Sequence, residues 1–380
     1  MYKKFVMGIA AMAALTLVSC SSDDLDSFSD NSSKNEAISF DGYLGRSAVA
    51  VNGTRGSVET AETLKKEGFG VFSKYTGSAS FPDFDNQKVT YSGSKWTYSP
   101  LKFWPAKGDI NFLAYAPYVK DYTLNNTSFD FTVADKAADQ QDLLWANAKG
   151  QITESLTSTK EKVKIHFYHA LSRLGYTVKL SGDYPSTDVT FTLKKITLAG
   201  SPDGTTKNAF YSKGTIDLSK TATNDNKEEL SKTNSETGLW KTEDTKQNFE
   251  WFSAGAQPVN ITYVDPTDQT KKPVSNGKDY LFVIPQDFSS TADGADKLYV
   301  IVEYEINYKS GTPSTISNKV YKQITPKFLQ GKAYMLNLTI GRPIEFDVDL
   351  TEGVGVEGWG TDEEINIGSG SNGNLWDGIE

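Results

Sequence analysis

Residues 88–98 read KVTYSGSKWTY, and this stretch decides the fold. Apolar or aromatic residues alternate with polar ones in 88–91 and again in 95–98, and a short Ser-Gly-Ser link separates the two runs. A glycine-containing link between two alternating runs predicts a β-hairpin. Further extended runs flank it at residues 69–75 and 110–116. Short strands at such spacing are typical of an all-β sandwich or barrel.

The same alternation extends along the rest of the chain. Further strands are predicted at residues 37–40, 47–51, 163–167, 174–180, 189–198, 280–284, 298–308, 334–340 and 344–350. Residues 201–248 are rich in Lys, Thr, Asn and Asp, and predict hairpins with long loops or an insertion. Residues 59–66 predict one short helix. We place a boundary between two domains near Gly200.

The first residues predict export from the cytoplasm. A Lys-Lys pair precedes an uncharged apolar run, residues 5–18, which is too short to span a bilayer and is typical of a secretory signal. The run ends in Leu-Val-Ser-Cys, which resembles the bacterial lipobox. Cys20 is the only cysteine of the chain, and lipidation explains a lone thiol in an exported protein. We therefore predict a signal peptide at 1–19 and a lipid on Cys20; the alternative is an ordinary signal peptide.

The chain that follows the signal is polar and acidic. Residues 20–36 are mainly Ser, Asp and Asn, so we expect a flexible tether with a reach of about 20 Å. The whole chain has 39 Lys and Arg against 48 Asp and Glu, a net charge of −9. Because an acidic surface repels phosphate backbones, we expect no nucleic-acid partner.

Motifs that carry catalysis or metal binding are missing from the sequence. It holds no Gly-x-Ser-x-Gly elbow and no phosphate-binding loop, and no pair of glycosidase carboxylates stands out. We interpret Asp109, Asp130 and Asp142 as turn or surface residues. The only two histidines, His166 and His169, would point to opposite faces of a strand. We therefore expect a protein that is not an enzyme and that binds no metal or cofactor.

A dense aromatic group begins in the predicted hairpin and consists of Trp96, Tyr98, Phe103 and Trp104. As an exposed, coplanar strip these rings would bind sugars, and as buried rings they would fill a core. We favour the core, because the facing sheets of an all-β domain need large side chains between them.

Three blocks of sequence carry a family resemblance. They are KWTYSPLKFWP at 95–105 with FLAYAPY at 112–118, DLLWA at 142–146 with VKIHFYHALSR at 163–173, and QGKAY at 330–334 with Trp359 beyond it. Together they resemble the fimbrillin family of Bacteroidetes, the Mfa-like subunits of type V pili. Within this family pattern His169 looks like a structural residue.

The resemblance implies a fold and a destination. The fold is two transthyretin-like β-sandwich domains in tandem, which we place at residues 37–200 and 201–365, before a flexible tail at 366–380. Such subunits travel as lipoproteins to the outer membrane. The acidic pair Asp23-Asp24 resembles the surface-export signal of Bacteroidetes lipoproteins.

The resemblance also implies that an arginine-specific protease removes the first strand. The groove left open then accepts a strand donated by another subunit, because a lost strand leaves unpaired backbone groups and an open apolar core. The implied partners are other fimbrial subunits, the outer membrane through the lipid anchor before maturation, and a host or bacterial surface receptor.

Four arginines are candidates for the cut. Arg173 lies beside a predicted buried strand, and Arg342 precedes a proline, which trypsin-like proteases cleave poorly. We prefer Arg55, because residues 52–57 (NGTRGS) form small, flexible chain of the kind that proteases need. Arg46 is the second candidate.

The C-terminal region is predicted to donate the strand. Its alternating apolar face would fill the trough left by Ile38 and Phe40, and consists of Ile344, Phe346, Val348 and Leu350. The alternative, with nearly equal weight, is that this stretch is the last strand of its own domain. The donor would then lie around Val354, Val356 and Trp359, or in the tail ending at Leu375 and Trp376.

We therefore predict a shaft subunit of a cell-surface fimbria that supports adhesion. A tip or adhesin subunit is the next candidate, because the long polar stretch 201–248 fits a shaft less well. A carbohydrate-binding surface lipoprotein is a candidate from a different class. A hydrolase is the third, and would need a cleft holding two carboxylates with perturbed pKa values.

Overall fold

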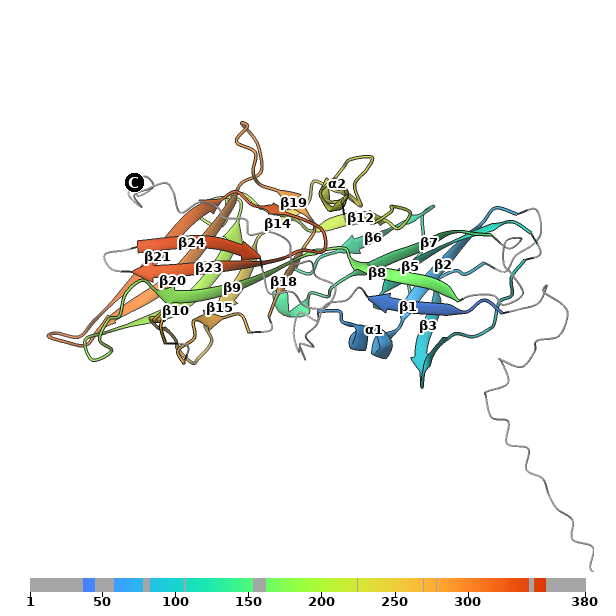
Figure 1. Ribbon diagram of the computed structural model, residues 1–380. Helices are drawn as coiled ribbons and strands as arrows, with labels where there is room; N and C mark the ends of the chain where they lie inside the picture. The colour runs from blue at the N-terminus through green and yellow to red at the C-terminus, as the bar shows by residue number, and fades with distance from the viewer. Residues whose placement is uncertain are drawn as a thin grey trace, which may run out of the picture.

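A computed structural model of the protein describes residues 37–44, 58–77, 83–105, 107–152, 162–223, 225–268, 270–277, 279–341 and 345–352. These residues form 24 strands, two short α-helices and one 3-10 turn, which confirms the predicted all-β fold. Figure 1 shows an elongated molecule, with the first strands of the chain at one end and the last strands at the other.

The first half of the chain forms a seven-stranded sheet. In pairing order its strands are β1 (Phe40–Leu44), β8 (Val163–His169), β7 (Leu144–Ile152), β5 (Asp109–Ala116), β2 (Phe69–Tyr75), β3 (Gln87–Ser92) and β4 (Lys95–Thr97). β1 runs parallel to β8, and the other neighbours are antiparallel. The β3–β4 pair confirms the predicted hairpin, with Gly93 in its turn at a φ of +66°.

This sheet curls until its two outer strands meet. β1 and β4 stand at opposite ends of the pairing order, yet the indole N–H of Trp96 on β4 donates to the carbonyl of Gly42 on β1 at 3.1 Å. Just before β1, the N–H of Ile38 donates to the carbonyl of Lys102 at 2.8 Å. β1 therefore closes the rolled sheet, which we call the roll.

The roll is buried on both of its faces. Along β5, Phe112 and Ala114 belong to a core inside the roll, whereas Leu113 and Tyr115 belong to the core of the second half. This division follows from the period of two in a strand, which sends neighbouring side chains to opposite faces. The inner core takes its buried residues from Ile38 to Phe167.

The second half of the chain forms two five-stranded sheets. One contains, in pairing order, β15 (Phe249–Ser253), β10 (Val189–Ala199), β20 (Leu298–Tyr308) and β21 (Ser314–Ile324), with β16 (Val259–Ile261) also on β10. The other contains β17 (Val274–Ser275), β9 (Ser172–Leu180), β23 (Ala333–Gly341) and β24 (Glu345–Glu352), with β18 (Leu281–Val283) also on β9. Buried side chains of both sheets share one hydrophobic core, as in a β-sandwich.

Three smaller sheets complete the described part of the fold. They are β13 (Trp240–Thr242), β12 (Lys213–Asp217) and β6 (Ser128–Thr132); β11 (Phe210–Tyr211) and β14 (Lys246–Gln247); and β19 (Gln286–Asp287) and β22 (Lys327–Phe328). The polar stretch 201–248 contributes β11 to β14 and the short helix α2 (Lys227–Ser231), which agrees with the hairpins predicted there. Because β12 pairs with β6, this stretch also ties the second half of the chain to the first.

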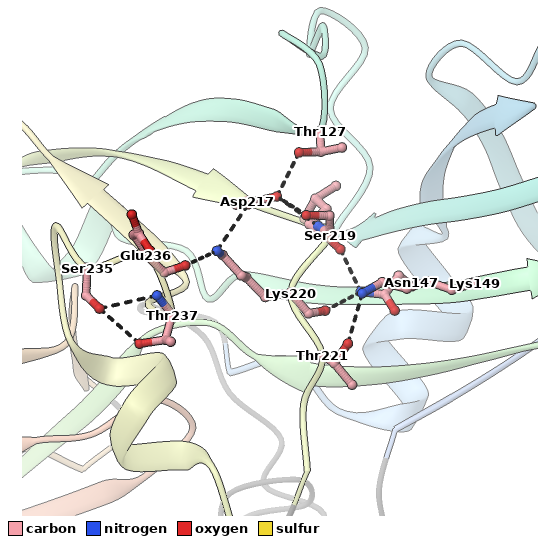
Figure 2. Close-up of polar contacts among 11 residues, drawn as sticks. Thr127, Asn147, Lys149, Asp217, Ser219, Lys220, Thr221, Ser235, Glu236 and Thr237 are labelled. Atoms are coloured by element: carbon pink, nitrogen blue, oxygen red, sulfur yellow. Dashed lines mark hydrogen bonds and ion pairs between the residues drawn. The ribbon is translucent and has the colours of Figure 1, made fainter. Parts of the chain in front are cut away.

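Polar contacts anchor the turn that follows β12 (Figure 2). The Oδ1 atom of Asp217 accepts hydrogen bonds from the hydroxyl of Thr127 at 2.8 Å and from the N–H of Ser219 at 2.9 Å. The Nδ2 atom of Asn147, on β7, donates to the carbonyl of Lys220 at 2.5 Å. The turn is thereby fixed to the outer face of the roll.

The predicted short helix is α1 (Ala61–Glu67), which follows the N-cap residue Thr60. The Thr60 hydroxyl accepts from the N–H of Thr63 at 3.2 Å, and the Thr63 hydroxyl accepts from the N–H of Thr60 at 2.7 Å, a reciprocal capping box. The one 3-10 turn is η1 (Ala137–Asp139). Among the described residues, no helix combines the length and the apolar character needed to cross a membrane.

The domain boundary expected near Gly200 stays a prediction, and the strand pairing favours an earlier position. β9 pairs with β23 and β10 pairs with β20, so both strands belong to the sheets of the second half. The inner core of the roll takes its last residue from β8. The chain therefore passes from one core to the other between β8 and β9.

Candidate functional site

β1 is held along both of its sides. Its five residues pair in parallel register with 163–167 of β8, from Phe40 opposite Val163 to Leu44 opposite Phe167. On its other side the hydroxyl of Tyr98 donates to the carbonyl of Ile38 at 2.7 Å. Together with the bond from Trp96 to Gly42, these contacts use the backbone of β1 and of the residues just before it, on the side away from β8.

The side chain of Phe40 is the aromatic centre of the inner core. Its ring centroid lies 5.3 Å from that of Phe112, 5.5 Å from Phe84, 5.7 Å from Tyr98 and 6.3 Å from Phe69. Most of these contacts are edge-to-face, the geometry that aromatic quadrupoles favour. Removal of β1 would therefore leave a cavity walled by aromatic rings.

Gly42 marks a close approach between β1 and the core. A Cβ atom built at this position would lie 2.9 Å from the Cε1 atom of Phe69 and 3.4 Å from the Cε2 atom of Trp96. The first distance is too short for carbon atoms in contact, whose optimal separation is about 3.5–4.0 Å. Only glycine therefore fits here without displacement of the Phe69 ring.

A hollow of about 280 Å³ lies against β1, between α1 and the β3–β4 hairpin. All five residues of β1 line it, together with buried Leu64 and Trp96. Exposed Lys65, Lys95 and Lys162 also line it, so its rim is cationic. None of the three lysines belongs to β1 itself.

Several of the predicted site residues lie outside the described residues: Cys20, Arg46, Arg55 and Ile344. In the sequence, Arg46 and Arg55 fall between Leu44, which ends β1, and Val58, where the described chain resumes. A cut at either arginine would separate β1 from everything that follows.

Arg173 is enclosed in the fold, as predicted from the strand beside it. It is 2% exposed, and its guanidinium lies 4.4 Å from the ring centroid of Tyr280. Burial lowers the pKa of Arg173 to about 10. A protease that reads arginine cannot reach this side chain in the folded chain.

The three described donor candidates belong to β24. Phe346, Val348 and Leu350 are buried, and β24 pairs antiparallel with β23 over its whole length. In this chain the stretch therefore pairs within its own sandwich and is the last strand that the structure describes, as the alternative to strand donation expects. A role as donor stays a prediction, and would require β24 to leave β23.

The aromatic group is mostly buried, as predicted. Trp96 and Trp104 are 7% and 4% exposed, Tyr98 is half-buried and hydrogen-bonded, and Phe103 is 47% exposed. These residues therefore serve the core and do not form a continuous exposed strip of the kind that binds sugars.

The interpretation of Asp142 as a turn or surface residue was wrong. Asp142 is 1% exposed, and its Oδ2 atom lies 2.7 Å from Nδ1 of His169, which is equally buried. The same oxygen accepts the N–H of Glu59 at 3.0 Å. Because these partners are distant in sequence, no local pattern signals the contact; only the resemblance points to a structural role for His169.

Glu59 is a further buried acid that the sequence did not single out. It is completely buried, and the hydroxyl of Thr63 donates to its Oε2 atom at 2.9 Å. Burial, and next the charge of Asp142, raise the pKa of Glu59 to about 8. Among the described residues, no three His, Cys, Asp or Glu side chains are placed to hold a metal ion. We assign this cluster to the anchoring of the chain just after the two candidate cut sites.

Comparison with known proteins adds the family. The sequence matches the fimbrillin-like family over residues 54–359. It is 26% identical to the fimbrium subunit Fim1C of Phocaeicola vulgatus over 397 aligned positions, which cover 94% of this chain and 97% of that protein.

Two solved structures extend the comparison. A fimbrial protein of Bacteroides vulgatus superimposes with a TM-score of 0.57 at 20% identity, over 84% of this chain and 99% of that one. The tip fimbrial protein Mfa3 of Porphyromonas gingivalis matches with a TM-score of 0.36 at 9% identity, over 76% of this chain and 96% of that one. The first likeness supports the fold. Since the family match spans most of the sequence, this chain belongs to the fimbrillin-like family.

Proposed function

We propose that this protein is a structural subunit of a cell-surface fimbria that assembles by exchange of its first strand. The subunit is exported as a lipoprotein on Cys20, cut at Arg55 or Arg46, and polymerised through a strand donated by another subunit. Membership of the fimbrillin-like family and the likeness to a protein named as a fimbrium subunit support this role. In this proposal the chain acts as a building block with no catalysis of its own.

The position of β1 is the observation that carries the proposal. Ile38, Phe40 and Leu44 are all buried in the inner core. Burial of such a side chain stabilises a fold by about 1.5–3 kcal/mol, so the three together contribute on the order of 5–9 kcal/mol. A chain that loses β1 therefore exposes both an apolar trough and the unpaired edge of β8, and a strand from another copy restores both.

The chain that follows the two candidate cut sites is well anchored. Glu59 and Thr60 are buried, and α1 begins at once behind its capping box. The backbone of Glu59 is tied to Asp142 at 3.0 Å. Loss of the preceding segment would thus remove β1 without unravelling α1.

Treatment of the purified chain with an arginine-specific protease tests the proposal. We expect wild-type protein to form filaments after cleavage, with Gly56 or Ser47 as the new N-terminus. The double variant Arg46→Ala, Arg55→Ala should stay monomeric under the same treatment, because β1 remains in place. Filaments from the uncut variant, or cleaved wild-type protein that remains monomeric, would contradict the proposal.

A further inference from the structure

The backbone of β1 has one edge that faces the hollow described above. The N–H of Val163 on β8 donates to the carbonyl of Ser39 at 2.8 Å. In the parallel register of this pair, Asp41 and Tyr43 therefore also turn their backbone groups toward β8. The residues between them, such as Gly42, turn their backbone groups the opposite way. Of the strands in the described part of the chain, β8 alone pairs with β1, so this second edge has no partner strand.

A single side chain crosses from β4 to this edge. The indole N–H of Trp96 donates to the carbonyl of Gly42 at 3.1 Å, and Trp96 is 7% exposed. Because the indole already occupies this carbonyl, an added strand cannot pair with β1 in an ordinary ladder. A compact molecule can rest against the indole and the edge of β1 without breaking the bond. The hollow of about 280 Å³ therefore suits a small ligand better than an extended peptide.

The rim of the hollow carries more positive than negative charge. Lys65 lies on α1, Lys95 on β4 and Lys162 just before β8, and all three are exposed. Asp41 is the one acidic side chain among the described residues that line the hollow. None of the three lysines forms an ion pair with a described carboxylate. A chain with a net charge of −9 thus gathers ammonium groups around one hollow, which complements an anionic ligand.

Aromatic and hydroxyl groups complete the wall of the hollow. The rings of Tyr91 and Trp96 meet edge to face with their centroids 5.1 Å apart, and the Nζ atom of Lys65 lies 5.2 Å from the Tyr91 centroid. Ser94, in the turn of the hairpin, also lines the hollow. Aromatic walls with a few polar groups are the usual lining of a small-molecule site. The apolar rings suit the C–H groups of a sugar, and the ammonium groups suit a carboxylate.

We propose that this hollow binds a sugar acid, such as the uronic acid unit of an acidic glycan. The carboxylate meets the ammonium groups of Lys65 and Lys95, and the sugar ring rests against Tyr91 and Trp96. The site exists wherever a strand occupies the place of β1, so each subunit of a fibre carries one copy, and many weak sites together give avidity. The repetition along a fibre rests on the proposed function, whereas binding by the uncut chain does not.

Calorimetric titration of the uncut chain tests the class of ligand. We expect glucuronate to bind saturably at low salt. Glucose has the same ring without the carboxylate, and should bind roughly tenfold more weakly or worse. Inorganic phosphate and a Glu-Glu-Glu tripeptide supply negative charge without a sugar ring. Absence of glucuronate binding, or equal or tighter binding of the tripeptide, would overturn the proposal, and equal binding of phosphate would reveal an adventitious ion only.

Matched variants locate the site within the fold. Lys65→Ala should weaken glucuronate binding roughly tenfold, because it removes an ammonium group from the rim. Lys66→Ala changes the next residue of α1, which is exposed and does not line the hollow, and should bind as the wild type does. Equal affinities of the two variants would overturn the site.

A second pair of variants tests the shape of the hollow. Ser94→Trp should fill it and abolish binding, whereas Ser92→Trp, on the other side of the hairpin turn, adds the same bulk outside the lining. Both positions are exposed, so the melting temperatures should stay close to that of the wild type. Equal binding by both variants would place the ligand elsewhere and overturn the proposal.

Filament assembly separates this inference from the proposed function. Cleaved wild-type chains that form no filaments would overturn the proposed function and leave binding by the uncut chain standing. Uncut chains that bind no glucuronate would overturn the sugar-acid site and leave assembly standing.

Discussion

At the scale of single residues, Glu59 connects protonation to stability. The pKa of Glu59 is raised from 4.5 to about 8, first by burial and then by the charge of Asp142. A carboxyl whose pKa is raised on folding binds its proton more tightly in the folded chain. The protonated Glu59 side chain therefore stabilises the fold fully below about pH 4.5, and this stabilisation is lost as the pH rises through about 8.

The variant Glu59→Gln should abolish this dependence. Glutamine keeps the shape and the acceptor for Thr63 but carries no titrating proton. We expect the wild type to lose melting temperature between about pH 4.5 and pH 8, and the variant to lose distinctly less. Glu62→Gln, on the exposed side of α1, serves as the control and should follow the wild type. Parallel curves for wild type and Glu59→Gln would rule out Glu59 as the titrating group.

Sequence patterns did not predict the role of residues whose partners are distant along the chain. Asp142 reads as a turn residue because its partners, Glu59 and His169, lie 83 and 27 positions away. The requirement for glycine at position 42 also depends on a distant residue, because it arises from the close approach of the Phe69 ring. By contrast, the burial of Trp96 and Trp104 could be predicted, because an all-β core needs large side chains.

At the scale of elements, Phe40 is the aromatic side chain that β1 buries in the inner core. Phe40→Ala should destabilise the uncut roll by about 3–5 kcal/mol, the usual cost of such a truncation in a core. We also expect β1 to open more often, which hydrogen exchange of residues 38–44 would detect. Tyr43→Ala alters the same strand at a side chain that is 44% exposed, and should have a much smaller effect. Equal protection in the two variants would show that Phe40 does not hold the strand.

The elements themselves were predictable where the signal is local. The β3–β4 hairpin and β20 follow from alternation and turn residues within a dozen positions. The capping box of α1 is local as well. The observed bounds of this helix differ by one or two residues from the predicted ones. The parallel pairing of β1 with β8 joins residues more than 120 positions apart, and the sequence pattern holds no signal for such a contact.

At the scale of the whole molecule, the chain builds two cores that share the seven-stranded sheet. Tyr115 and Trp145 point from the outer face of the roll into the core of the sandwich. The β6–β12 pair and the contacts of Asp217 and Asn147 join the halves further (Figure 2). Alternation predicts that a strand such as β5 has two faces, but not which core each face meets.

The predicted export and lipid anchoring are likewise tested on the whole chain. We expect Cys20→Ala to yield unprocessed or unanchored protein, because the variant lacks the thiol that would carry the lipid. Fractionation of cells into membrane and soluble material measures the outcome, and Ser21→Ala is the control. Normal processing and membrane partitioning of Cys20→Ala would refute lipidation at this cysteine.

The parallel pairing of β1 with β8 imposes a direction on any polymer built in this way. A donated strand that keeps the pairing of β1 runs parallel to β8, and each joint then repeats the same head-to-tail orientation. The resulting fibre is polar: an empty trough marks one tip, and an unused donor strand marks the opposite tip. Growth by addition at the trough end would halt when a subunit without a vacant trough arrives, whereas a subunit without a donor strand would block the other end.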